Sequence, residues 1–529
     1  MLDRGATKAL YDFDEARYGE IAKNIVRSND WFSMHAGYPD DISVSQKETV
    51  DFWKPPLQPM GIALSYKLFG INEFATRLPS LLFFCGTLIV LFLLLQKLFP
   101  DDMNTNVLIV FLFAALGDSS FIAHQGIAES QLLFFNLLAI YFFTKSHNNL
   151  RRCSRSQPNL VGHGDPDLRR DDSLYRLILA GAIWGLALLT KGFAAWWVPA
   201  ILILFNFKFE ILNFKLIVQR LILFLICGLV VALPWHWYMY VQFGKLFVDH
   251  YLLINTIGRS VGATANVAPF WWYGAWMVWN WRPVIFIVPL IVSRLLSFRL
   301  SEAHGEILRD PSTSLGMTKR TSSKTIIRIF FWFLIIIIPF SLIRSKVWWY
   351  IYPASIPLII LVVRVMKKNF LLGAILLLIS LFPFWQMGAA PIKWQMAGYV
   401  FVMIVAIVLQ GRIPKLIDKK IQMIFVALII FTSLFISIPK SFENTDKNRD
   451  LKVLASRNIP LFNLSVYNLP YEAALFYFDS GVITKNNMHS VYQLADTKDQ
   501  GALRKKGYVT IDREGERALM KRDPKAISD

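Results

Sequence analysis

Long runs of apolar residues alternate with short polar segments along most of the chain. Crossing the hydrocarbon core of a bilayer as a helix takes about 20 predominantly apolar residues. We predict twelve membrane-spanning helices, the shorter of which extend at their ends or tilt within a bundle, at 78–95, 107–122, 131–143, 174–189, 194–205, 221–237, 276–293, 329–343, 349–363, 370–384, 394–409 and 421–438. The predicted fold class is mainly α, a polytopic bundle of about twelve transmembrane helices.

Polar segments flank this bundle on both sides. In residues 1–77, apolar side chains recur at helical spacing after Asp14, which predicts an amphipathic helix lying along the membrane surface, and 57–69 predicts a second one. Residues 440–529 change composition sharply and alternate like a small α/β domain. Its predicted strands are 464–467, 482–484 and 508–511, and its predicted short helix is 471–478. We therefore expect a first loop (1–77), a helical bundle (78–439) and a C-terminal α/β domain (440–529).

Charge sets the orientation of the bundle. The chain is 55% hydrophobic and 18% charged, with a net charge of +19, whereas soluble domains average about 25% charged residues. Clusters of Lys and Arg follow the odd-numbered predicted spans, and such loops face the cytoplasm. An even number of spans then places both ends of the chain outside. This distribution favours a lipid bilayer as the partner of the basic residues and argues against nucleic acid.

The residues that could carry chemistry lie at the outer ends of the predicted spans. Asp14 and Glu15 open the first amphipathic helix, where the helix dipole favours a carboxylate, although Asp14 could also serve only as an N-cap. Two prolines after Lys54 fix an extended backbone and hold that lysine in place. The remaining candidates are Arg17, Glu129, Lys191, Arg259, Arg344, Lys346 and Tyr350. Each charge taken alone could instead be an interfacial, snorkelling one.

Together these residues fit an anionic, sugar-carrying lipid. Displacement at the anomeric carbon of a sugar needs a base that accepts the proton of the acceptor hydroxyl. A departing phosphate has a second pKa of about 6 and leaves without a protonating acid, provided that cations stabilise its charge. A carboxylate surrounded by several Lys and Arg side chains is therefore a sufficient set.

Several motifs resemble those of the C-type membrane glycosyltransferases. The resemblance lies in 14–30 (DEARYGEIAKNIVRSND), 54–57 (KPPL), 68–79 (LFGINEFATRLP), 189–192 (LTKG), and in Ser345-Lys346 followed by Tyr350 and Pro353. The chain most resembles glycosyltransferase family 39, which is related to the protein O-mannosyltransferases and to the lipid A aminoarabinose transferases of bacteria.

The resemblance implies a function and a location. Such enzymes transfer a sugar from a polyprenyl phosphate, undecaprenyl phosphate in bacteria, to a lipid, glycan or protein acceptor on the extracytoplasmic side, usually with inversion. It implies a multi-pass protein of the cell inner membrane. Asp14 takes the place of the essential acidic residue, with Glu15 beside it, and Glu129 stands where the family usually has Asp. The phosphate ligands would be Arg17, Lys54, Lys191, Arg259, Arg344 and Lys346, and Glu129 and Tyr350 would contact the rest of the substrate.

The sequence departs from this family in two respects. Some relatives have an acidic residue before the lysine and an acidic–His pair before the later arginine, a set suited to a divalent metal, where this chain has Trp53 and Asn255-Thr256. We therefore expect no such metal site and no cofactor, with a divalent metal held by other residues as the alternative. Relatives also have one more transmembrane helix before the acidic motif, whereas Asp14 follows only 13 residues, as in a truncated chain or one with a misplaced start.

Two other functions compete with the enzyme. An inactive family member would keep the fold as a scaffold. A secondary transporter would place its charges near the middle of the membrane, within internal repeats, which the sequence does not contain. The sugar and the acceptor stay undetermined.

Overall fold

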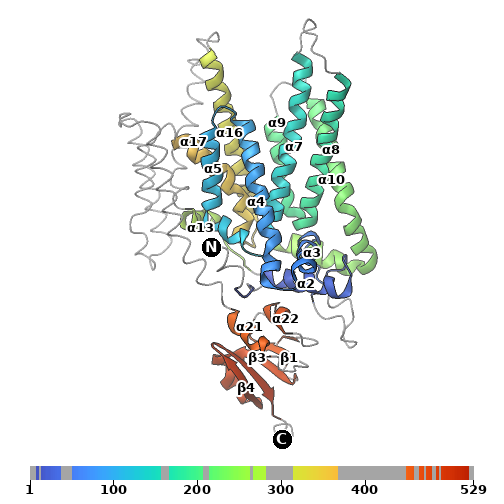
Figure 1. Cartoon of the computed structure of the whole chain (residues 1–529), viewed down its shortest axis with the longest axis vertical. Helices are drawn as coiled ribbons and strands as arrows, with labels where there is room; N and C mark the ends of the chain where they lie inside the picture. The colour runs from blue at the N-terminus through green and yellow to red at the C-terminus, as the bar shows by residue number, and fades with distance from the viewer. Residues whose placement is uncertain are drawn as a thin grey trace, which may run out of the picture.

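The computed structural model describes residues 8–10, 14–36, 50–155, 166–206, 214–262, 266–281, 314–366, 448–457, 464–469, 472–478, 484–485, 487 and 490–523. The chain is mainly helical, with a small C-terminal sheet below one end of a helical bundle (Figure 1). This agrees with the predicted fold class at the level of helices and sheet. The predicted spans 370–384, 394–409 and 421–438, and most of 276–293, lie outside the described residues.

The bundle is built from long helices joined by short 3₁₀ and π segments. Its elements are α4 (Glu73–Leu98), α5 (Met103–Ala115), α6 (Gly117–Ala123), α7 (Glu129–Arg155), α8 (Pro166–Lys191), η1 (Gly192–Ala195), α9 (Trp197–Asn206), α10 (Phe214–Phe243), α11 (Lys245–Phe247), η3 (Val248–Gly258), α12 (Arg259–Val261), α13 (Trp272–Asn280), α16 (Ser314–Leu342), η5 (Trp348–Ala354) and α17 (Ser355–Met366). Within the described residues, four helices are long and apolar enough to cross a membrane: Glu73–Leu98, Ser173–Ala195, Leu216–Phe243 and Thr325–Leu342.

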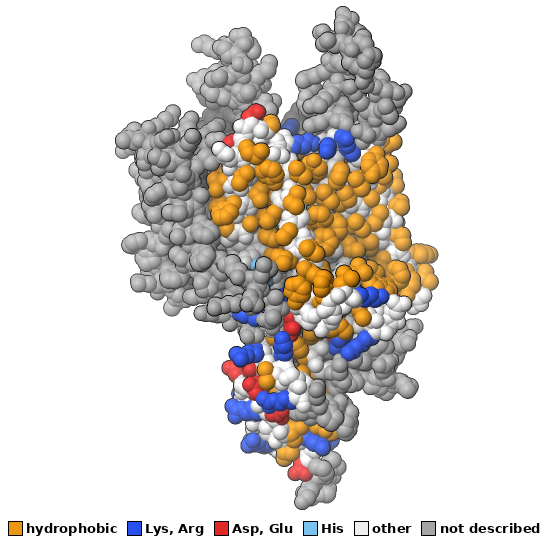
Figure 2. Space-filling model, viewed as in Figure 1, with side chains coloured by type: hydrophobic (Ala, Val, Ile, Leu, Met, Phe, Trp, Pro, Cys, Tyr) orange, Lys and Arg blue, Asp and Glu red, His pale blue; other side chains and the backbone are white. Residues whose placement is uncertain are grey.

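Hydrophobic side chains cover the flank of the bundle, and Lys and Arg side chains gather at the end of the bundle opposite the C-terminal domain (Figure 2). Leu82 and Ile89 on α4 are each 62% exposed, and Val230 on α10 is 65% exposed. Soluble monomers rarely expose such continuous apolar surface. A lipid environment, in which apolar side chains lose nothing by facing outward, accounts for this pattern.

One predicted span is not straight. The run 107–122 was expected to form a single helix, but α5 and α6 meet at an angle of 67°. Leu116 adopts an extended conformation between them, and the poor helix former Gly117 opens α6. The break places Asp118 where its Oδ2 accepts a hydrogen bond of 2.7 Å from the indole of Trp281, which satisfies a carboxylate that a continuous apolar helix would leave unpaired.

The first loop forms two helices, α2 (Asp14–Ser28) and α3 (Leu57–Phe69), across the lower end of the bundle (Figure 1). The prediction for 57–69 agrees with α3. Helix α2 differs from the expected surface helix because almost all its side chains from Glu15 to Ile25 are buried. Its polar face contains an ion pair of 2.8 Å between Lys23 and Glu20. Lys23 also donates to the carbonyl of Phe476 in the C-terminal domain, so this domain covers the face that was expected to meet water.

The C-terminal domain is a five-stranded mixed sheet with short helices. Its elements are α21 (Arg449–Ser456), β1 (Leu464–Tyr467), α22 (Glu472–Tyr477), β2 (Thr484–Lys485), β3 (Tyr492–Asp496), η7 (Thr497–Asp499), α23 (Gln500–Arg504), β4 (Tyr508–Glu514) and β5 (Arg517–Arg522), and the strand order is β2-β1-β3-β5-β4. β1 pairs in parallel with β2 and β3, whereas β5 pairs antiparallel with β3 and β4. The sequence predicted three of these strands and α22, but not β3 or β5.

Candidate functional site

Asp14 lies at the first turn of α2 and faces four cations. Burial acts to raise the pKa of its carboxyl group, but the positive charges of Lys54, Lys191, Arg259 and Arg17 outweigh this effect, and the pKa lies below its usual value. The four cations come from α2, the loop before α3, the end of α8 and the start of α12. Segments far apart in sequence therefore converge on one carboxylate at the lower end of the bundle.

Lys54 is the least satisfied of these cations. Among the described residues it forms neither an ion pair nor a hydrogen bond. Burial lowers the pKa of its ammonium group to about 8, with Asp14 acting to raise it and the charges of Lys191 and Arg259 lowering it further. Pro55 and Pro56, both buried, hold the lysine between like charges. Such a group gains most from a bound anion.

Trp53 and Asp51 support the two arginines. Arg17 forms an ion pair of 2.7 Å with the buried carboxylate of Asp51, which also accepts a hydrogen bond of 2.7 Å from the backbone N–H of Trp53. The indole of Trp53 has both guanidinium groups within cation–π range, Arg17 at 5.8 Å and Arg259 at 5.3 Å from its centre. Arg259 also donates a hydrogen bond of 2.5 Å to the hydroxyl of Tyr350.

Lys191 and Glu129 form a buried ion pair at the ends of two bundle helices. Glu129 opens α7 and is 4% exposed, and Lys191 ends α8 and is 9% exposed. The ammonium also lies 5.7 Å from the ring centre of Tyr350. The chain turns directly after Lys191 at Gly192, whose φ is +54° and where a Cβ would lie 2.5 Å from the hydroxyl of Tyr251. Glycine is therefore required for the turn that presents this lysine.

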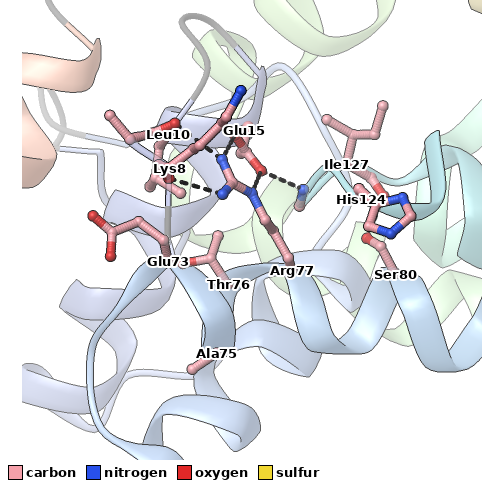
Figure 3. Close-up of polar contacts among 12 residues, drawn as sticks. Lys8, Leu10, Glu15, Glu73, Ala75, Thr76, Arg77, Ser80, His124 and Ile127 are labelled. Atoms are coloured by element: carbon pink, nitrogen blue, oxygen red, sulfur yellow. Dashed lines mark hydrogen bonds and ion pairs between the residues drawn. The ribbon is translucent and has the colours of Figure 1, made fainter. Parts of the chain in front are cut away.

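Glu15 does not share the surroundings of Asp14. Both its oxygens accept hydrogen bonds from Arg77, at 2.8 and 2.9 Å, and Oε1 also accepts from the backbone of Gly126 at 2.8 Å. Arg77 in turn donates to the carbonyls of Lys8 and Ala9 (Figure 3). Glu15 is fully buried. It joins α2 to α4 and to the loop before α7, and its carboxylate is engaged by three hydrogen bonds from these elements.

Arg344 and Lys346 also depart from the expected arrangement. Lys346 points its ammonium at the carbonyls of Ser341 and Ile343, at the C-terminal end of α16, where the helix dipole favours a cation. Burial lowers the pKa of Lys346. Arg344 is exposed and donates to the carbonyl of Val261. These side chains stabilise the turn between α16 and η5, beside the cluster around Asp14.

The two positions at which some relatives have metal ligands, Trp53 and Asn255-Thr256, hold other side chains here. Within the described residues, no group of three or more His, Cys, Asp or Glu side chains is placed to bind a metal ion. The indole of Trp53 and the amide of Asn255 occupy these positions, and the side-chain amide of Asn255 donates a hydrogen bond to the backbone carbonyl of Trp53. Neither side chain offers the charged oxygen or imidazole ligands that a divalent cation prefers.

Sequence reasoning missed three site residues, Asp51, Trp53 and Tyr18. Tyr18 is one helical turn after Asp14, and its buried hydroxyl has no hydrogen-bond partner within the part of the chain that the structure describes. Because Tyr18 belongs to the apolar stripe of α2, its spacing indicated a side chain that contacts the membrane surface. The spacing of Tyr18 from Asp14, i to i+4, was the available signal for a shared face.

Comparisons with known proteins find relatives of this chain. Residues 8–251 match the family described as dolichyl-phosphate-mannose-protein mannosyltransferase. The chain is 24% identical over 366 residues to the undecaprenyl phosphate-alpha-4-amino-4-deoxy-L-arabinose arabinosyl transferase of Pseudomonas aeruginosa (strain UCBPP-PA14), covering 68% of this chain and 56% of that protein. The protein of the same description from Wigglesworthia glossinidia brevipalpis is 23% identical over 363 residues, covering 68% and 55%. The chain thus spans a little over half the length of these curated relatives.

The fold has a solved counterpart. The crystal structure of ArnT from Cupriavidus metallidurans bound to undecaprenyl phosphate superposes with a TM-score of 0.67 at 16% identity, over 99% of this chain and 96% of that one. The apo form of the same protein gives the same TM-score at 15% identity. The two chains share one fold from the first loop to the C-terminal sheet.

Proposed function

We propose that the chain is a membrane glycosyltransferase, because residues 8–251 match the dolichyl-phosphate-mannose-protein mannosyltransferase family. It takes a sugar from a polyprenyl phosphate, undecaprenyl phosphate in a bacterial membrane, and transfers it to a hydroxyl group of an acceptor. The observation that supports this proposal best is the position of Asp14, a single carboxylate facing Lys54, Lys191, Arg259 and Arg17.

Asp14 acts as the base in this proposal. The acceptor hydroxyl attacks the anomeric carbon, its proton passes to Asp14, and the bond from that carbon to the phosphate oxygen breaks. Attack on the face opposite the phosphate inverts the configuration at the anomeric carbon. The lowered pKa of Asp14 keeps it ionised at neutral pH before the carrier binds, and the negative charge of a bound phosphate would raise that pKa and make Asp14 a stronger base.

The cations bind the phosphate and stabilise it as it leaves. Lys54 is central because it lacks a partner among the described residues and lies near both Lys191 and Arg259. Breaking the bond to the sugar converts a phosphodiester with one negative charge into a monoester with up to two. Preorganised cations stabilise this added charge without further rearrangement. Tyr350 holds Arg259 in place for this contact.

The site lies on the extracytoplasmic side in this proposal. Cations at the other end of the bundle include Lys97 at the end of α4, Lys145 on α7, Arg220 on α10 and Arg364 on α17, and the side rich in Lys and Arg faces the cytoplasm. The first loop and the C-terminal domain then lie in the periplasm of a bacterial inner membrane. The twelve predicted spans, with the three beyond residue 366, belong to this topology.

Replacing Asp14 with Asn tests the function. The full chain, purified in lipid nanodiscs, is incubated with a mixture of undecaprenyl phosphate-linked sugars and a bacterial envelope extract as acceptor. We expect Asp14→Asn to lower the rate of undecaprenyl phosphate release about 10²-fold or more, while binding of undecaprenyl phosphate persists. Lys54→Met should instead lose the binding. Unchanged turnover in Asp14→Asn would contradict the assignment, and failure of the native chain to bind undecaprenyl phosphate would contradict the function.

A further inference from the structure

Two buried polar groups near Asp14 have no hydrogen-bond partner among the described residues. The hydroxyl of Tyr18 belongs to a side chain that is 2% exposed, and Oε2 of Glu129 belongs to one that is 4% exposed. The other oxygen of Glu129 is paired with Lys191. Leaving a buried donor or acceptor unpaired costs about 1–3 kcal/mol. Both groups therefore indicate a place where polar atoms of a ligand bind.

Tyr18 lies near both Asp14 and Glu129, because the charges of these two carboxylates act on its phenol. Burial raises the pKa of the Tyr18 phenol, and the carboxylates of Asp14 and Glu129 raise it further, so Tyr18 stays protonated as a hydrogen-bond donor. Glu129 supplies an acceptor. A sugar hydroxyl both donates and accepts hydrogen bonds, so one such group can satisfy the phenol and the carboxylate oxygen together.

The charges of the cluster around Asp14 limit the net charge that a bound ligand can have. Around Asp14 the described residues place four cations, Arg17, Lys54, Lys191 and Arg259, and two further carboxylates, Asp51 and Glu129. The cluster therefore holds four positive and three negative charges. A phosphodiester-linked sugar brings one negative charge, which balances the excess. Since transfer only moves a proton from the acceptor to Asp14 while the phosphate gains a charge, the balance holds through the reaction.

We propose that the transferred sugar is uncharged, a neutral pentose or hexose whose hydroxyl groups bind between Tyr18 and Glu129. This inference rests on the proposed function. An amino sugar would add an ammonium group beside Glu129 and Lys191, both of them buried, and restore the excess positive charge. That ammonium would have to share Glu129 with Lys191, which already neutralises it. A buried charge without its own counter-ion is strongly unfavourable.

A matched pair of donors tests the proposal. Undecaprenyl phosphate-linked arabinose and its 4-amino-4-deoxy analogue differ only in a hydroxyl against an ammonium group, and undecaprenyl phosphate alone reports on the phosphate site. Binding of each to the full chain in nanodiscs is measured at pH 7. We expect the neutral arabinose donor to bind at least about tenfold more tightly than the amino donor. Equal or tighter binding of the amino donor overturns the proposal.

A second arm locates the sugar subsite. Tyr18→Phe removes only the unpaired hydroxyl and keeps the packing of α2, so it should not impair folding. We expect it to weaken binding of the arabinose donor about tenfold and to leave binding of undecaprenyl phosphate unchanged. Tyr66→Phe is the control, because Tyr66 is an equally buried tyrosine whose hydroxyl bonds to Thr76.

The outcomes separate the two proposals. If undecaprenyl phosphate itself does not bind, the glycosyltransferase assignment falls and the sugar subsite with it. If undecaprenyl phosphate binds and Tyr18→Phe has no more effect on the arabinose donor than Tyr66→Phe, the carrier site stands and the subsite is refuted.

Discussion

Asp14 and Glu15 are neighbours in sequence, and their replacement should have opposite consequences. Glu15 is fully buried and accepts two hydrogen bonds from Arg77, itself 6% exposed, and one from Gly126. Glu15→Ala leaves a buried guanidinium without its counter-ion, which costs about 3–5 kcal/mol. Glu15→Gln keeps the shape and part of the hydrogen bonding and should cost less, about 1–3 kcal/mol.

Asp14→Asn should cost much less stability. Among the described residues Asp14 accepts no hydrogen bond, and it is only partly buried. The pKa of Asp14 is lowered in the folded chain, so its ionised form contributes stability above its unfolded pKa of about 3.9, and that contribution is lost as the pH falls through the lower folded value. Since this attraction acts without a direct bond and is screened, its loss is about 0–1 kcal/mol.

Heating and turnover measured on the same samples separate these effects. The native chain, Asp14→Asn, Glu15→Gln and Glu15→Ala are heated in detergent, and the fraction that stays monodisperse is followed by size-exclusion chromatography. We expect Asp14→Asn to match the native midpoint and lack turnover, and Glu15→Ala to lose about 3–5 °C. Folded Glu15→Gln should retain turnover. A Glu15→Gln variant as stable as the native chain and as inactive as Asp14→Asn would refute this division of roles.

Three further predictions concern the cations and the turn that presents one of them. Because the pKa of Lys54 is about 8, its positive charge is present at pH 7 and is lost as the pH rises. Binding of undecaprenyl phosphate should therefore weaken between pH 7 and 9. Lys54→Arg should remove this pH dependence. Lys54→Met should abolish that binding yet raise the thermal midpoint, since it removes a repelled, half-buried cation. Gly192→Ala should lower turnover about tenfold or more, because the added Cβ would lie too close to the hydroxyl of Tyr251 and because a φ of +54° strains alanine. Tyr251→Phe should partly restore turnover. Full activity of Gly192→Ala would contradict the close packing.

The sequence predicted where the site would form, but less well which residues build it. Apolar runs and loop charges placed Asp14, Lys54, Lys191 and Arg259 at one end of the bundle, and the structure brings these four together. Such convergence is predictable because the ends of antiparallel helices of similar length must meet at one face of the membrane. It required no knowledge of side-chain packing.

Roles that depend on side-chain direction were not predictable from order along the chain. Consecutive residues of a helix point about 100° apart, so Glu15 was assigned to Asp14's site although it faces α4 and Arg77. Lys346 follows a helix end and binds its carbonyls, a local contact that competes with any ligand. Asp51 came from a polar stretch without periodicity, and only the ion pair with Arg17 identifies it.

The arrangement of the cluster explains how four cations are held together before a substrate binds. Each of three has its own support: Arg17 the carboxylate of Asp51, Lys191 that of Glu129, and Arg259 the hydroxyl of Tyr350. Lys54 alone is left without a bonded partner among the described residues. The chain thereby confines the unfavourable charge to one position, fixed by two prolines and facing Asp14. A bound phosphate relieves that position, so the strain that costs stability in the free protein favours binding of the anionic carrier over that of a neutral lipid.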